Sequence, residues 1–140
     1  MSKSRRILIM GLPGAGKTTL ADELHELILS VGLKSHWLNE NRLKEEYPNL
    51  TIDQVHTMAN DHAVDYVVAD FEAPQSVMRR SFNAHYTIWV NTIPEEDYNS
   101  VGHGFEPPFR YNVCVTTKDA PKWAREIFRH ILFLENLNER

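Results

Sequence analysis

Short apolar runs alternate with longer segments of helical periodicity along the whole chain. The first run, Arg5 to Met10, is followed by apolar residues at helical spacing between Leu20 and Val31. Short branched runs are typical of strands buried on both faces, whereas apolar residues three and four apart are typical of helices. The same patterns predict further strands over residues 35–39, 66–69, 86–90 and 111–115, and further helices over 41–47, 52–63, 74–84 and 119–137.

This alternation predicts an α/β fold in which a five-stranded parallel sheet is flanked by helices in three layers. Ligands of such sheets bind at the carboxyl ends of the strands. Residues 91–110 interrupt the alternation, because they show no periodicity and contain three prolines and two glycines. A connection of this length without regular structure is typical of a functional loop.

The composition narrows the class of protein. The 140 residues, of which 42% are hydrophobic, fit one domain over residues 1–140. The single cysteine, Cys114, cannot form an internal disulfide, which favours a cytoplasmic location. The apolar run from Ile7 to Met10 is too short to span a membrane, and the net charge of −4 argues against binding to duplex DNA.

A phosphate-binding motif lies between the first predicted strand and helix. Residues 11–18 follow the pattern G, four residues, G-K-[ST], which is typical of the P-loop. Its glycines allow a tight turn of backbone N–H groups toward phosphates, at the positive end of a helix. Lys17 is expected to reach the β and γ phosphates and Thr18 to coordinate Mg²⁺.

The motif therefore predicts a P-loop NTPase fold with ATP as the bound nucleotide. A glycine turn that only joins a strand to a helix does not account for Lys17 followed by Thr18. The guanine-reading motif of GTPases is missing, so the chain is nearer to a small-molecule kinase. The predicted ATP-binding residues are Gly11, Pro13, Gly14, Ala15, Gly16, Lys17, Thr18 and Thr19.

Polar residues follow the predicted second and third strands. Asp70 can hold Mg²⁺ or accept the proton of an attacking hydroxyl, or it can simply cap the turn behind its strand. Residues 40–44 offer an acid, an amide and two cations to an acceptor, although an exposed helix start has the same composition. Arg79 can pair with an anion or lie in solvent, and Phe105 can cover the site or pack under its loop.

Four segments, GLPGAGKTTLADEL, WLNENRLKEEY, YVVADFEAP and FEPP, resemble in this order the short members of the adenylylsulfate kinase family. The resemblance extends from Arg6 to Pro108. It implies transfer of the ATP γ-phosphoryl group to the ribose 3′-hydroxyl of adenosine 5′-phosphosulfate (APS), a step of sulfate assimilation. Members of this family often form dimers, so the resemblance adds a homodimer as an option.

The match departs from the family at the acceptor motifs. The family pattern L-D-G-D-N-[VI]-R falls on residues 38–44, so Asn41 stands at the catalytic aspartate and Lys44 at the arginine that reads the substrate. Asn41 cannot act as a general base, but it can orient a hydroxyl. The following segment contains no arginine, and the lysine-rich lid is replaced by the acidic residues 93–104.

Together, the residues and the resemblance assign three sets of roles. Lys17, Asp70 and Asn41 are the predicted catalytic residues, and Thr18 and Asp70 are the predicted Mg²⁺ ligands. The predicted acceptor-binding residues are Asn41, Lys44, Phe71, Arg79 and Phe105. Two other interpretations stay open: a kinase for another nucleotide or for a polynucleotide end, and a nucleotide-binding pseudokinase.

Overall fold

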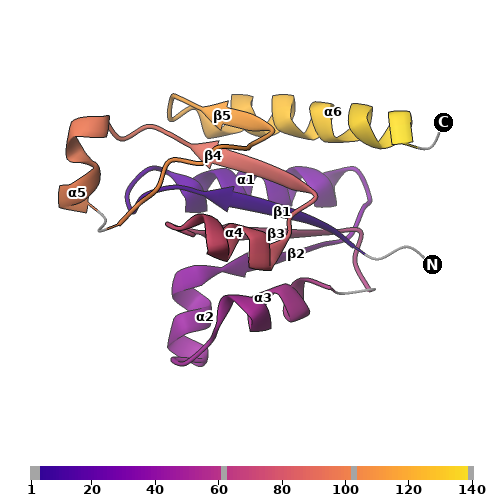
Figure 1. Cartoon of the computed structure of the whole chain (residues 1–140). Helices are drawn as coiled ribbons and strands as arrows, with labels where there is room; N and C mark the ends of the chain where they lie inside the picture. Colours follow the sequence, from indigo (N-terminus) through magenta and orange to yellow (C-terminus); the bar gives the residue numbers. More distant parts are fainter. Residues whose placement is uncertain (1–3, 61–62, 102–103, 139–140) are drawn as a thin grey trace.

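The computed structural model describes residues 4–60, 63–101 and 104–138 as an α/β sandwich around one parallel sheet (Figure 1). The strand order is β2-β3-β1-β4-β5, and every neighbouring pair is parallel. This confirms the predicted fold class. The strands are β1 (Arg5–Met10), β2 (Ser35–Asn39), β3 (Tyr66–Phe71), β4 (Tyr86–Val90) and β5 (Val113–Val115). The helices are α1 (Lys17–Ser30), α2 (Glu40–Glu46), α3 (Ile52–Ala59), α4 (Ser76–Phe82), the 3₁₀ turn η1 (Glu95–Asp97), α5 (Tyr98–Val101) and α6 (Ala120–Asn138).

The two faces of the sheet are covered by different helices, because successive side chains of a strand point to opposite faces. In β1, Ile7 and Ile9 pack with α1 and α6, whereas Leu8 and Met10 pack with α2, α3 and α4. Both sets are at most 1% exposed. The apolar run that predicted this strand is unbroken because its residues alternate between two cores, one on each face of the sheet.

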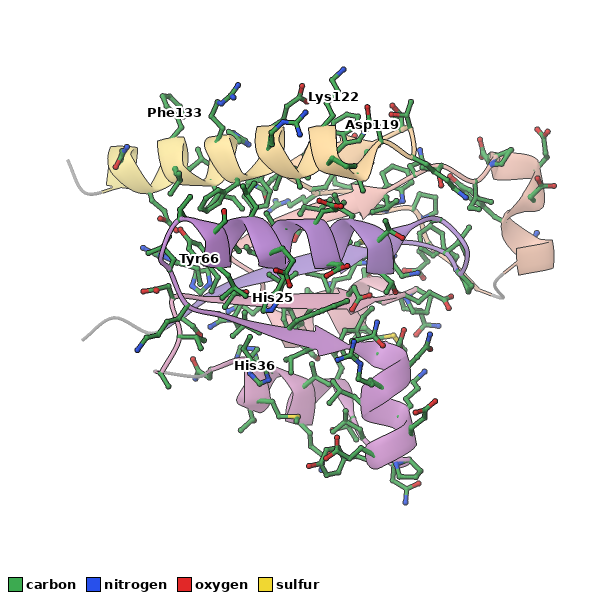
Figure 2. All side chains as sticks on the ribbon, turned by 180° about the vertical axis from the view of Figure 1, so that it is seen from behind. His25, His36, Tyr66, Asp119, Lys122 and Phe133 are labelled. Atoms are coloured by element: carbon green, nitrogen blue, oxygen red, sulfur yellow. The ribbon has the colours of Figure 1, made fainter. Side chains whose placement is uncertain are left out.

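The closing helix α6 packs its main apolar stripe against the sheet. Ile127 and Ile131 lie in the core beside α1, whereas Lys122 and Phe133 point away from the sheet on the opposite side (Figure 2). The side chain of Leu137, which the sequence placed on the same apolar stripe, lies outside the described residues. None of the helices in the described ranges combines the length and the apolarity that a membrane span requires.

Several predicted boundaries differ from the structure. The strand predicted over 66–69 continues through Asp70 and Phe71, which pair with Ile9 and Met10 of β1. The strand predicted over 111–115 begins at Val113, because the side chain of Asn112 takes the place of a backbone acceptor and binds the N–H of Thr87.

Two helical segments also differ. The helix predicted over 52–63 ends at Ala59; its predicted capping box of Thr51 and Gln54 is present. Residues 61–62, which the longer prediction included, lie outside the described part. The loop of residues 91–110 contains the short helical turns η1 and α5, and its residues 102–103 also lie outside that part.

The P-loop passes very close to β4 where it leaves β1. Gly11 has φ +154, and a Cβ atom built on it would lie 2.6 Å from the backbone oxygen of Val90. Neither backbone can move away easily, because Gly11 directly follows β1 and Val90 ends the neighbouring strand β4. This contact fixes a glycine at the first position of the motif for steric reasons alone.

We therefore expect Gly11→Ala to destabilise the fold more than Gly32→Ala. Both glycines have a positive φ, but no atom lies within 4 Å of a Cβ on Gly32. Each variant suffers the strain of a left-handed alanine, about 1–2 kcal/mol, and only Gly11→Ala adds an overpacking cost of about 1–3 kcal/mol. Urea unfolding of both variants measures the difference, and equal losses would contradict the steric argument.

Candidate active site

The P-loop is held by hydrogen bonds to its own carbonyl groups. Lys17 Nζ donates to the Leu12 oxygen at 2.9 Å, and Lys118 Nζ donates to the Gly14 oxygen at 3.0 Å. The hydroxyl of Thr92 donates to the Ala15 oxygen at 2.7 Å. These contacts come from three different parts of the chain, and they fix the loop in a concave shape at the start of α1.

The N-terminus of α1 receives no side-chain cap. Its N-cap is Gly16, whose φ of 106 is left-handed and which makes no side-chain cap to the first-turn N–H groups of this 14-residue helix. Uncapped N–H groups and the helix dipole together form a site for anions. The arrangement is therefore suited to the phosphates that the motif predicts.

A cleft of about 570 Å³ opens over the P-loop and extends to both sides along the strand ends. One side, which we call the nucleoside arm, is formed by Thr117 and Lys118 of the connection from β5 to α6 and by Trp123 in the first turn of α6. The other side, which we call the acceptor arm, is formed by the ends of β2 and β3 and by α2. Its lining includes Asn39, Glu40, Asn41, Lys44, Asp70 and Glu72.

Asp70 lies at the floor of the cleft with its carboxylate bound by three side chains. Thr18 Oγ1 donates to it at 2.8 Å, Trp37 Nε1 at 3.0 Å and Asn39 Nδ2 at 2.9 Å. The register of the sheet explains this meeting, because Asn39 and Asp70 are direct partners in the ladder of β2 and β3. Burial raises the pKa of Asp70, and the hydrogen bonds from Trp37, Thr18 and Asn39 oppose that shift.

The pair of Thr18 and Asp70 fits the predicted Mg²⁺ site chemically. A hydroxyl and a carboxylate are the hard oxygen ligands that Mg²⁺ prefers. The 2.8 Å hydrogen bond between them places both oxygens next to the P-loop. Histidine and cysteine take no part, and the described residues contain no cluster of three or more His, Cys, Asp or Glu that could hold a metal by itself.

Lys17 lies between the P-loop and the acceptor arm. Burial lowers the pKa of Lys17, and the negative charges of Glu40, Glu72 and Asp70 oppose that shift. All three carboxylates line the acceptor arm, so the ammonium group faces this side of the cleft. A terminal phosphate held by Lys17 would face the same side.

The acceptor arm contains linked charges. Glu40 Oε1 accepts the backbone N–H of Glu72 at 2.9 Å, and Glu40 Oε2 lies 3.2 Å from Lys44 Nζ. Burial and the charge of Glu40 raise the pKa of Glu72, whereas Lys17 and Lys44 act in the opposite direction. Asn41 is exposed at the rim of the same arm.

Three predicted acceptor residues do not line the cleft. Phe71 is 5% exposed and packs in the core under α2, α3 and α4, because strand alternation turns it away from the face of Asp70. Arg79 donates to the backbone oxygens of Ala73 at 2.8 Å and Pro74 at 3.0 Å, and also to that of Glu106. Phe105 lies against the guanidinium of Arg79, so this pair fastens the loop to α4.

The sequence did not point to Trp37, Asn39 or Glu72 as site residues. Trp37 and Asn39 stand two residues apart on β2, so both face Asp70 once the strands are in register. The residue types gave no such signal, because a tryptophan in an apolar run is typical of a core. Glu72 directly follows β3, and this position at the carboxyl end of a strand was the available hint of its place in the cleft.

Comparison with known proteins shows the fold. No protein-family model and no curated protein sequence matches the chain. Among solved structures, an APS kinase of Mycobacterium tuberculosis in complex with AMPPNP and APS is 13% identical, with a TM-score of 0.79 over 92% of this chain and 98% of that one. A hexameric APS kinase from Thiobacillus denitrificans is 18% identical, with a TM-score of 0.69 over 96% of this chain and 29% of that one. A possible uridine kinase from Bacillus stearothermophilus is 15% identical, with a TM-score of 0.58 over 82% and 90%. The chain therefore has the fold of P-loop kinases.

We expect Trp37→Phe to destabilise the protein by about 1.5–3 kcal/mol at neutral pH, because it removes a hydrogen bond to a buried carboxylate. Without this donor the pKa of Asp70 rises further, so the variant binds a proton more readily in the folded state. The deficit against the native protein therefore shrinks as the pH falls through the pKa of Asp70. Urea unfolding at two pH values measures this trend.

The control is Trp89→Phe, which makes the same change in β4, away from Asp70. Its smaller loss of stability should not depend on pH in the acid range. If the two variants behaved alike, the hydrogen bond from Trp37 would not support Asp70.

Proposed function

We propose that this protein is an ATP-dependent small-molecule kinase. It transfers the γ-phosphoryl group of Mg-ATP to a hydroxyl of an acceptor bound in the acceptor arm. The observation that carries this proposal is the junction of the P-loop with the hydrogen-bonded pair of Thr18 and Asp70 in the middle of a cleft with two arms. Such a cleft has room for a donor on one side and an acceptor on the other.

The proposed roles follow from position. Backbone N–H groups of the P-loop hold the phosphates, and Lys17 stabilises the charge that develops during transfer. Thr18 and Asp70 would hold Mg²⁺, which when bound neutralises phosphate charge. The nucleoside arm, with Lys118 and Trp123, would take the base and ribose of ATP.

Proton transfer from the acceptor is a further part of the proposal. Asp70 already accepts from three donors, and the exposed amide of Asn41 lines the acceptor arm where the family has an aspartate. In a loose transition state the protein mainly positions the reacting groups and stabilises charge. Asn41 would therefore orient the acceptor hydroxyl, and no strong base at this position is required.

The resemblance supports APS or a similar nucleotide as the first acceptor to test. It likewise supports a cytoplasmic enzyme of sulfate assimilation and a homodimer. Another nucleotide or a polynucleotide end is the second option, which is favoured by a specific observation: Lys44, which stands at the substrate-reading arginine of the family, is paired with Glu40. Incubation of the protein with labelled ATP and each acceptor in parallel distinguishes these options.

We expect Lys17→Ala to lower the rate of phosphoryl transfer at least about a hundredfold, because the variant loses a positive charge that stabilises the transferred group. The fold should be retained, since the side chain makes one hydrogen bond to the P-loop backbone. Turnover of labelled ATP and circular dichroism measure the two effects. Lys122→Ala is the control, because Lys122 lies on the outer side of α6 (Figure 2). Wild-type transfer by Lys17→Ala would overturn the proposed function.

Asn41→Asp tests the pseudokinase alternative. If the native protein is a kinase, the added carboxylate should change its turnover by less than about tenfold, because Asn41 only orients the hydroxyl. A protein that binds Mg-ATP tightly, transfers nothing to a broad panel of acceptors and gains transfer with Asn41→Asp would instead be a pseudokinase. Single-turnover transfer from labelled ATP separates the two results.

A further inference from the structure

The acceptor arm contains more negative than positive charge. Its carboxylates are Glu40 and Glu72, beside the buried Asp70 at the cleft floor, and its cation is Lys44. Lys44 is already matched, because its ammonium lies 3.2 Å from Glu40. Lys17 belongs to the phosphate site, where it donates to the backbone of the P-loop.

Glu72 is a carboxylate of this arm that no described donor contacts directly. Its backbone N–H binds Glu40, but within the described ranges its side chain takes part in no hydrogen bond or ion pair. The side chain is partly buried and lines the cleft. A ligand in the acceptor arm would therefore meet a carboxylate that is shielded in part from water and has no hydrogen-bond donor, with Lys17 and Lys44 farther away.

The arginines near this arm are committed elsewhere. The guanidinium of Arg42 lies 4.9 Å from the ring centre of Trp37, and Arg79 binds the backbone oxygens of Ala73 and Pro74. Neither side chain lines the cleft, and no arginine does so among the residues that the structure describes. The bidentate donors with which proteins usually bind phosphate or sulfate are thus not offered to the acceptor.

We infer that the acceptor is a hydroxyl compound that carries a protonated amine and no phosphate or sulfate group. The inference rests on the proposed kinase activity, and for the acceptor it replaces APS, which the resemblance supports, by the class that the charges of the cleft favour. An ammonium group would bind the Glu72 carboxylate in a charge-assisted hydrogen bond. A sulfate or phosphate would instead be placed beside Glu40 and Glu72, where like charges repel at low dielectric.

The charge of the donor strengthens this selection. The triphosphate of ATP fills the P-loop side of the cleft with negative charge, and Lys17 is used there. A cationic acceptor would approach this charge favourably, whereas an anionic one would need extra cations to reach it.

The test uses two matched sets of ligands with the full chain. The first set is 5′-amino-5′-deoxyadenosine, adenosine and APS, and the second is glucosamine, glucose and glucose 6-phosphate. Calorimetry measures binding of each compound in the presence of Mg²⁺ and AMPPNP, and labelled ATP measures transfer. In at least one set we expect the amine to bind at least about tenfold more tightly than the anion, which corresponds to roughly 1.4 kcal/mol.

Glu72→Gln should reduce that preference to about threefold or less, because it removes the charge and keeps the shape of the side chain. Glu126→Gln is the matched control, since Glu126 is exposed on α6 and does not line the cleft. The control should keep the full preference. Circular dichroism of both variants shows whether they fold.

The inference is overturned if the amine binds no more tightly than the anion in both sets, or if the anion binds more tightly than the amine. An unchanged preference in Glu72→Gln also overturns it. Failure of the proposed function gives a different result, because the protein would then not bind Mg-ATP in the same calorimeter. Mg-ATP binding together with a preference for APS overturns the acceptor class alone.

Discussion

The buried carboxylate of Asp70 is the interaction on which the arrangement of the site depends. Asp70 is 2% exposed, and a charge at such a position is tolerated only when hydrogen bonds replace its water. The donors come from α1 and β2. The carboxylate therefore has all its hydrogen bonds only when α1 is packed on the sheet and β2 is paired with β3. The same contacts hold Thr18 of the P-loop beside the acceptor arm.

The two arms of the cleft are built from different parts of the chain. The residues of the acceptor arm follow β2 and β3, whereas those of the nucleoside arm follow β5. The P-loop follows the central strand β1 and lies between them. A substitution at the exposed rim of the acceptor arm, such as at Asn41, therefore leaves the nucleoside arm and the contact of Thr18 with Asp70 in place.

The fold and the phosphate site were predictable because their signals are local. The apolar run of β1 and the spacing of Gly11, Lys17 and Thr18 can each be recognised within one short segment of the sequence. The acceptor side was not predictable, because it depends on contacts between segments that are distant in the sequence. Trp37 faces Asp70 only through the register of β2 and β3, and Arg79 binds backbone oxygens, which the residue types do not indicate. Phe71 and Phe105 were assigned to the acceptor although strand alternation and the contact with Arg79 place them elsewhere.

The contact of Lys118 with the P-loop has a consequence for the order of assembly. Gly14 and Lys118 are separated by 104 positions in the chain, and Ala15 and Thr92 by 77. Such distant contacts form after local structure, because closing a long loop costs entropy before any contact compensates for it. During synthesis the P-loop leaves the ribosome long before Thr92 and Lys118, so it reaches its final shape only after these two residues have followed.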